Sequence, residues 1–97
     1  MRASPRDVVV QLRAFSGELN GIALIHAGAD RAELARLSSS ADEIAGHIGE
    51  TVSDDTAQSL IGLANRVHSM ADHNRDATCA ARLSVAASVL STFARRD

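Results

Sequence analysis

The chain has 97 residues, of which 45% are hydrophobic and 23% charged, and its formal net charge is -2 at neutral pH. This length and composition are typical of one small globular domain over residues 1–97, and they exclude a disordered tail or a fibre. The slight negative charge argues against a general nucleic-acid-binding protein, which needs an excess of positive charge on one face.

Residue usage is skewed within these ordinary totals. The sequence contains 18 Ala and 11 Ser, its ten basic residues are all Arg, and Phe15 and Phe93 are its only aromatic residues. A hydrophobic core formed by this chain must therefore be built from small and aliphatic side chains. Arg in place of Lys, together with abundant Ala, is typical of a GC-rich genome, so we expect a bacterial source.

The single cysteine and the apolar segments bear on where the chain resides. One cysteine, Cys79, excludes an intramolecular disulfide and favours a reducing environment. The N-terminal apolar run Val8–Val10 is too short for a signal peptide, and no eighteen apolar residues follow one another. We therefore expect a cytoplasmic protein with no membrane contact.

Residues 4–27 are predicted to form the first helix. Ser4 suits the N-cap position, Pro5 the first helical position, and Asp7 the positively polarised first turn. Gly28 is expected to stop the helix. Between these ends apolar residues recur at spacings of three and four, which places them on one stripe: Val8, Leu12, Phe15, Leu19 and Ile22, followed by His26.

A β-hairpin is the alternative for this segment. Asn20-Gly21 is a dipeptide typical of tight turns, and strands over residues 8–15 and 21–27 could pair around it. Gly17 and Gly21 would each cost a helix about 1 kcal/mol. The six matches to helical spacing nevertheless favour the helix, and we expect its Gly17 and Gly21 to seat a neighbouring helix of the same fold.

Three further helices are predicted. Asp30 caps the second, which should end between Gly49 and Val52, Ser53 opens the third, and Asn74 caps the fourth. The second carries an apolar stripe of Leu34, Leu37, Ala41, Ile44 and Ile48, and the third one of Ala57, Leu60, Ala64, Val67 and Ala71. Because Ala at core positions lets helices approach closely, the second and third helices are expected to form a tight hairpin.

The fourth helix is apolar on more than half of its circumference. Its apolar residues are Cys79, Ala80, Leu83, Val85, Ala86, Ala87, Val89, Leu90, Phe93 and Ala94. A helix of this kind is buried on more than one side. We therefore expect it either to be the central helix or to present Val85, Val89, Leu90 and Phe93 to another chain.

Four helices of similar length joined by short loops predict an all-α fold, an antiparallel four-helix bundle of up-down-up-down topology. In that topology the first and third loops lie at one end and gather imidazoles and carboxylates there. His26, His68, Asp72 and His73 are the candidate metal ligands, since zinc, iron and manganese bind such groups. The chain lacks the paired Glu-x-x-His segments of di-iron bundles, so we expect helix caps and no bound metal or other cofactor.

Other groupings could also carry chemistry. Glu43, His47 and Glu50 share one face of the second helix, as a possible ligand triplet or pH-sensitive group, although a solvated face is the simpler interpretation. Cys79 near the start of the fourth helix could be a nucleophile beside His73, but its neighbours are apolar and favour a buried thiol.

Four arginines gather where the chain ends meet. They are Arg2, Arg6, Arg95 and Arg96, and acidic residues of the second loop are expected at the same end. Because no aromatic side chain is there to stack on bases, a nucleic-acid site is not favoured.

The sequence therefore predicts a small interaction module and no enzyme. The fourth helix has more apolar surface than one seam needs, and a chain of this size buries only about 60% of its unfolded surface. We expect an adaptor, chaperone or inhibitor, of cellular, phage or plasmid origin, that presents a helical face to another protein or forms a homodimer. A metal- or small-ligand-binding bundle is the alternative, and a DNA-associated regulator is the third.

Overall fold

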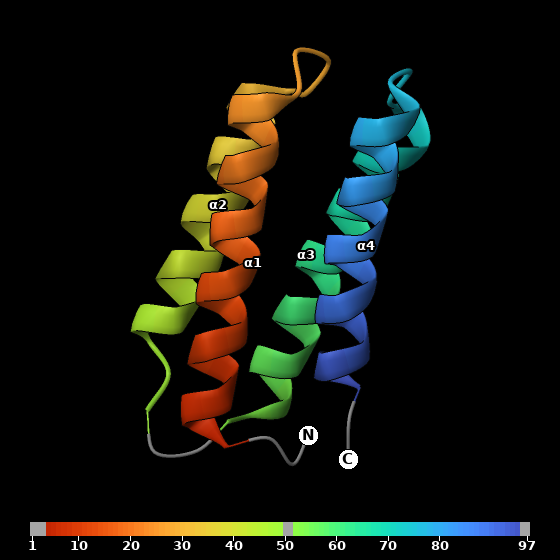
Figure 1. The fold of residues 1–97 in the computed structure, drawn as a ribbon. Coiled ribbons are helices and arrows are strands. Elements are labelled where there is room, and N and C mark those ends of the chain that lie inside the picture. The colour runs from red at the N-terminus through yellow and green to blue at the C-terminus, as the bar shows by residue number, and fades with distance from the viewer. Residues whose placement is uncertain (1–3, 50–51, 96–97) are drawn as a thin grey trace.

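The computed structural model describes residues 4–49 and 52–95. All regular structure in these two segments is helical: α1 (Pro5–Ile25), α2 (Arg31–Gly46), α3 (Asp54–His73) and α4 (Ala77–Ala94). Figure 1 shows consecutive helices running in opposite directions, with α1 and α3 rising and α2 and α4 descending. The predicted all-α four-helix bundle is confirmed. Because α1 is continuous through Asn20 and Gly21, the hairpin alternative is wrong.

Side-chain caps begin all four of these helices. The predicted caps Ser4, Asp30 and Ser53 each accept a hydrogen bond from the backbone N–H three residues on, at 3.0–3.2 Å. The prediction for α4 is wrong by two residues, because Asp76 caps it and Asn74 instead ends α3. Asn74 accepts a hydrogen bond from the backbone N–H of Asp76 at 2.8 Å, so the two residues turn the chain together.

Two helices end earlier than predicted. α1 stops at Ile25 rather than at Gly28, and α2 stops at Gly46, before the predicted Gly49 to Val52. Over the described segments no residue has a positive φ, so Gly28 does not end α1 by a left-handed turn. It instead allows close approach, since a Cβ at Gly28 would lie 3.3 Å from the Cβ of Asp76.

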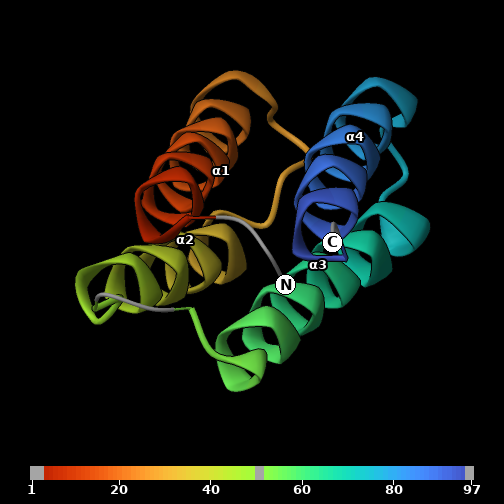
Figure 2. The ribbon, with the colours of Figure 1, turned by 90° about the horizontal axis from the view of Figure 1, so that it is seen from below.

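The helices pack as two hairpins of sequence neighbours. α1 lies along α2, and α3 lies along α4, as Figure 2 shows in end view. The seam between α1 and α4 joins the hairpins, while α2 and α3 touch least. The predicted tight hairpin of the second and third helices is therefore wrong. The reason is that α2 has one narrow buried stripe, and this stripe faces α1, where the hydroxyl oxygens of Ser16 and Ser38 lie 2.6 Å apart.

One hydrophobic core contains residues of all four helices. Phe15 and Phe93 are its largest side chains, and they keep 5% and 6% of their surfaces exposed. The largest of those that are fully buried are, apart from Val and Cys, all Leu or Ile. They are Leu12, Leu19, Ile22, Leu34, Leu37, Leu60, Leu83 and Leu90. The core is thus mainly aliphatic, as the composition predicts, and it also contains both phenylalanines.

Candidate functional site

The α1–α2 loop and the α3–α4 loop meet at one end of the bundle, as predicted. The side-chain amide of Asn74 donates a hydrogen bond to the backbone carbonyl of Gly28 at 3.3 Å. Gly28, Asp30, His73 and Asp76 border a hollow of about 500 Å³ at this end. The topology therefore does bring the two loops of the predicted metal-binding end together.

His26 is held by protein groups. Its Nε2 atom accepts a hydrogen bond from Nη1 of Arg82 at 3.3 Å, and its Nδ1 atom lies 3.9 Å from a carboxylate oxygen of Asp76. Because Arg is a donor and never an acceptor, the lone pair of Nε2 is occupied and the ring proton lies on Nδ1, toward Asp76. His26 therefore joins α1 to α4 and has no lone pair directed to a metal.

The other metal-ligand candidates do not form a group of three with His26 or with one another. Nδ1 of His73 lies 2.8 Å from the backbone carbonyl of Ser69, which belongs to the last turn of the same helix. His68 is half-buried within α3, and Asp72 is exposed. Within residues 4–49 and 52–95 no three His, Cys, Asp or Glu side chains stand close enough to hold a metal ion. The four candidates are thus not assembled into a site.

Three histidines lie at helix ends, and two of them, His47 and His73, make the same contact with their own helix. His26 and His47 are the C-caps of α1 and α2, and His73 is the last residue of α3. His47 repeats the contact of His73, with its Nδ1 atom 2.7 Å from the backbone carbonyl of Glu43. A donor at this position adds a hydrogen bond to a carbonyl near the negative end of the helix dipole.

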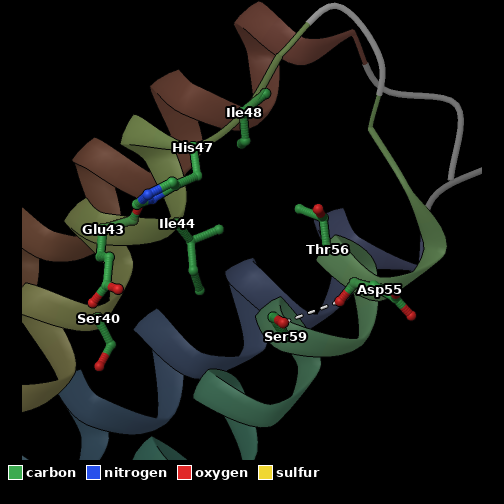
Figure 3. Close-up of a pocket in the computed structure, with 8 residues that line it drawn as sticks. All are labelled: Ser40, Glu43, Ile44, His47, Ile48, Asp55, Thr56 and Ser59. Carbon is green, nitrogen blue, oxygen red and sulfur yellow. Dashed lines mark hydrogen bonds between the residues drawn. The ribbon is translucent and has the colours of Figure 1, made fainter.

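A groove of about 380 Å³ separates α2 from α3 where the two helices touch least. Figure 3 shows Ile44 and Ile48 on its α2 side, with Glu43 and Asp55 on opposite walls. The two carboxylates do not converge, and His47 is engaged with its own helix. Glu50, the third member of the predicted triplet, lies outside the described residues. The groove therefore has an apolar floor and a polar rim but no assembled set of ligands.

Cys79 is fully buried. Burial, and then the charge of nearby Asp76, raises the pKa of its thiol, against the opposing effects of Asn74 and Arg82. The Asn74 amide donates to the sulfur at 3.4 Å. A buried thiol with a raised pKa is a poor nucleophile. This geometry supports the interpretation of Cys79 as a core residue.

The remaining predicted site is the arginine group near the chain ends. Arg6 and Arg95 are exposed, and Arg2 and Arg96 lie outside the described residues.

Exposed apolar side chains gather on two adjacent helices. Across the described segments all large hydrophobic residues that are mostly exposed belong to α1 or α4, from Val89 at 54% to Leu24 at 81%. They are Val10, Leu24, Ile25, Val85 and Val89. α1 and α4 pack against each other, so their outer surfaces are continuous.

We define the α1/α4 face by one outward stripe on each helix. Residues spaced by three and four lie on one side of a helix. The α1 stripe is Val10, Ala14, Gly17, Gly21 and Leu24, and the α4 stripe is Ala81, Val85, Ser88, Val89 and Thr92. All are exposed except Gly21, which is half-exposed. A groove of about 300 Å³ runs between the helices and is walled by Ala14 on α1 and by Val85 and Val89 on α4.

The four residues predicted for interaction divide into two pairs. Val85 and Val89 are exposed on the α1/α4 face, as the prediction requires. Leu90 and Phe93 instead belong to the core, with 1% and 6% of their surfaces exposed. Leu90 lies under the groove, so it supports the exposed valines but does not itself project toward a partner. When a helix is apolar around most of its circumference, the sequence does not show which of its residues the other helices of the same domain will bury.

The sequence prediction missed the charge pair on this face. Glu18 is the only Asp, Glu or Arg in residues 14–25, and Arg82 is the only one in residues 77–94. Oε1 of Glu18 accepts hydrogen bonds from Nη2 of Arg82 at 2.9 Å and from its Nε at 3.3 Å. The sequence carries a signal for this pair, because a single acid in residues 14–25 and a single base in residues 77–94 are expected to meet when these two segments pack together.

By length and composition α1 and α4 would each be able to cross a membrane, a test that core helices of soluble bundles also pass. We expected no membrane span because the sequence has no uninterrupted run of eighteen apolar residues. A helix can be long and apolar enough on average without such a run. Comparisons with protein-family models, curated proteins and solved structures gave no match to this chain.

Proposed function

We propose that this chain is a non-enzymatic, intracellular protein–protein interaction module that binds through the α1/α4 face. The observation that carries the proposal is the confinement of all large exposed hydrophobic side chains, among the described residues, to α1 and α4. Exposed apolar surface that is contiguous over two helices is typical of an interaction site, whereas single exposed residues are not.

The chemistry of the face defines the partner it suits. Glu18 and Arg82 neutralise each other, and the two stripes otherwise carry apolar, small or hydroxyl side chains. A surface of this kind favours a helical partner with small and aliphatic side chains, because an unpaired charge brought against it would lose water without gaining a counter-ion.

A matched pair of variants tests the proposal. Ala81→Arg places a charge on the α1/α4 face, and Ala35→Arg is its control, since both residues are exposed and each is the fifth residue of its helix. Each tagged chain is captured from its native host, and the assemblies are weighed by native mass spectrometry. We expect a stoichiometric protein partner with the wild type and with Ala35→Arg, and none with Ala81→Arg.

Two results would contradict the proposal. Association that survives Ala81→Arg would place the partner elsewhere on the molecule. A bare chain carrying one metal ion would favour the alternative function at the loop end, and His73→Ala would then abolish metal binding. In the proposed module His73→Ala leaves association unchanged.

A further inference from the structure

We infer that the α1/α4 face docks on the same face of a second copy of this chain, which makes the protein a two-fold symmetric dimer. The inference rests on the proposed function and names the partner of its site. In a two-fold interface the same patch lies on both sides, so the patch must be compatible with itself in charge and in shape.

The charge of the face meets this requirement. A patch with unpaired charge of one sign would repel its copy, but here Glu18 and Arg82 form an ion pair within each chain, with 2.9 Å between Oε1 and Nη2. The outer surfaces of α2 and α3 carry more exposed charged residues, of which Arg36 is paired with Glu33 of its own helix. Their exposed charged residues are Arg31, Arg36, Glu43, Asp54, Asp55, Arg66 and Asp72. On α1 the exposed Arg13 lies beside Val10 and Gly17, and it is paired with Asp42 of α2 at 3.2 Å. Two copies therefore meet over the α1/α4 face with less electrostatic cost than over the outer surfaces of α2 and α3.

The shape of the face is also self-complementary. Ala14, Gly17 and Gly21 make the α1 stripe low, and a Cβ built on Gly17 would have no neighbour within 4 Å. Val85 and Val89 rise beside it on α4. In a two-fold pair the valines of one chain lie over the glycines of the other, and the same contact forms twice. This arrangement gives a packing partner to Gly17, which has none within its own chain.

The area of the face is sufficient for a stable dimer. Two helices of about 20 residues, each about 30 Å long and 10 Å across, present roughly 600 Å² side by side. A symmetric pair therefore buries about 1,200 Å² in total, which is the lower end of the range for specific interfaces. Interfaces of this size are typical of partners that also exist apart, whereas obligate dimers usually bury more than about 2,000 Å².

Sedimentation equilibrium of the purified chain, over protein concentrations from about 1 μM to about 500 μM, tests the inference. Gly17→Leu fills the low α1 stripe, and Gly62→Leu is the control, because Gly62 is also an exposed helical glycine whose added Cβ would have no neighbour within 4 Å. We expect the wild type and Gly62→Leu to reach twice the chain mass of 10.2 kDa. Gly17→Leu should weaken the dimer at least about tenfold. Circular dichroism of each variant verifies that its helices are intact.

Each other outcome overturns the inference. A wild type that stays monomeric up to the highest concentration has no self-association, and equal dimerisation of both variants would place the interface elsewhere. Loss of the dimer in both variants would also contradict it, because Gly62 lies on α3. A monomer that co-sediments with phosphatidylglycerol vesicles would assign the face to a membrane. If the purified chain is monomeric while the capture experiment still yields an Ala81-dependent foreign protein, this inference fails and the proposed function stands.

Discussion

The hydroxyl oxygens of Ser16 and Ser38 lie 2.6 Å apart in the buried seam between α1 and α2. Each hydroxyl also lies 3.4 Å from the backbone carbonyl of the other residue, so the pair forms a closed polar group within an aliphatic core. Two small hydroxyls with mutual partners allow the helices to approach closely without leaving a buried polar atom unsatisfied.

We expect Ser16→Ala to lower the free energy of unfolding by about 1–2 kcal/mol, because Ser38 then loses its side-chain partner. The double variant Ser16→Ala/Ser38→Ala should cost less than the sum of the two single variants, since no orphan hydroxyl remains. Urea unfolding of the four proteins measures this coupling. Strictly additive costs would show that the two hydroxyls do not depend on each other.

Neighbouring residues on α4 should respond oppositely to the same charge. Leu90→Asp is expected to prevent folding, because a carboxylate would be buried in the core with no partner. Val89→Asp should leave a folded monomer, since Val89 is more than half exposed on the α1/α4 face. Far-UV circular dichroism during a urea titration separates the two. An unfolded Val89→Asp protein would mean that this side of α4 belongs to the core.

Gly62 offers a stabilising substitution. It lies exposed within α3, and an added Cβ meets no atom within 4 Å, so Gly62→Ala should raise the free energy of unfolding by about 1 kcal/mol. For a domain of this size the melting temperature should rise by about 4–8 °C. Gly28→Ala is the comparison, because its added methyl would press on Asp76 at 3.3 Å, and we expect no such gain. Thermal unfolding of both variants checks this difference.

The buried thiol of Cys79 should make stability fall at alkaline pH. Burial raises its pKa in the folded chain above the ordinary value of 9.0, so the folded state favours the neutral thiol. Below pH 9 the thiol is neutral in both the folded and the unfolded chain, so the fold keeps its full stability. As pH rises from 9 toward the folded pKa, the unfolded chain loses its thiol proton first and the free energy of unfolding falls. Because the chain has no Lys and no Tyr, Cys79 is its only side chain that titrates in this range.

Urea midpoints at pH 8 and pH 10 test this expectation. The wild type should lose stability between the two values, whereas Cys79→Ala should show no such loss. Thiolate absorbance near 240 nm gives a second readout, because neither Tyr nor Trp is present to obscure it. Titration of the native thiol at or below its ordinary pKa would contradict the assignment.

Arg82 joins the two hairpins and should matter more than an ordinary surface arginine. Arg82→Met keeps an aliphatic side chain but removes the donor to Glu18 and His26, and we expect a loss of about 1 kcal/mol because the pair is partly exposed. Arg36→Met is the control, since Arg36 pairs with Glu33 of its own helix on the surface. Unfolding in low and high salt measures both, and the Arg82 effect should shrink as salt rises.

The helices could be predicted from sequence because several local signals agree in each. The caps Ser4, Asp30 and Ser53 and the apolar spacing of α1 all hold in the structure. The cap of α4 could not be predicted, because Asn74 and Asp76 are both good capping residues two positions apart. In the structure Asp76 begins α4 because its carboxylate accepts from the backbone N–H groups of Thr78 and Cys79, and Asn74 ends α3 and accepts from the N–H of Asp76.

Packing and the candidate site were less predictable, because they depend on which neighbour each stripe meets. The alanines of α2 suggested close packing on α3, but the same stripe fits α1 equally well, and Ser16 and Ser38 favour that choice. Gly17 was expected to seat a helix of the same chain and instead faces outward. The sequence indicates His26 as a candidate metal ligand, but its Nε2 atom accepts a hydrogen bond from Arg82, which is 56 residues away along the chain.

The pairing of helices by sequence order also has a kinetic consequence. Because α1 with α2 and α3 with α4 are adjacent in the chain, most native contacts close short loops. Helical proteins of such low contact order fold in microseconds to milliseconds. The contacts between α1 and α4, which bring the first helix against the last, close the longest loop and carry the largest loop-closure entropy.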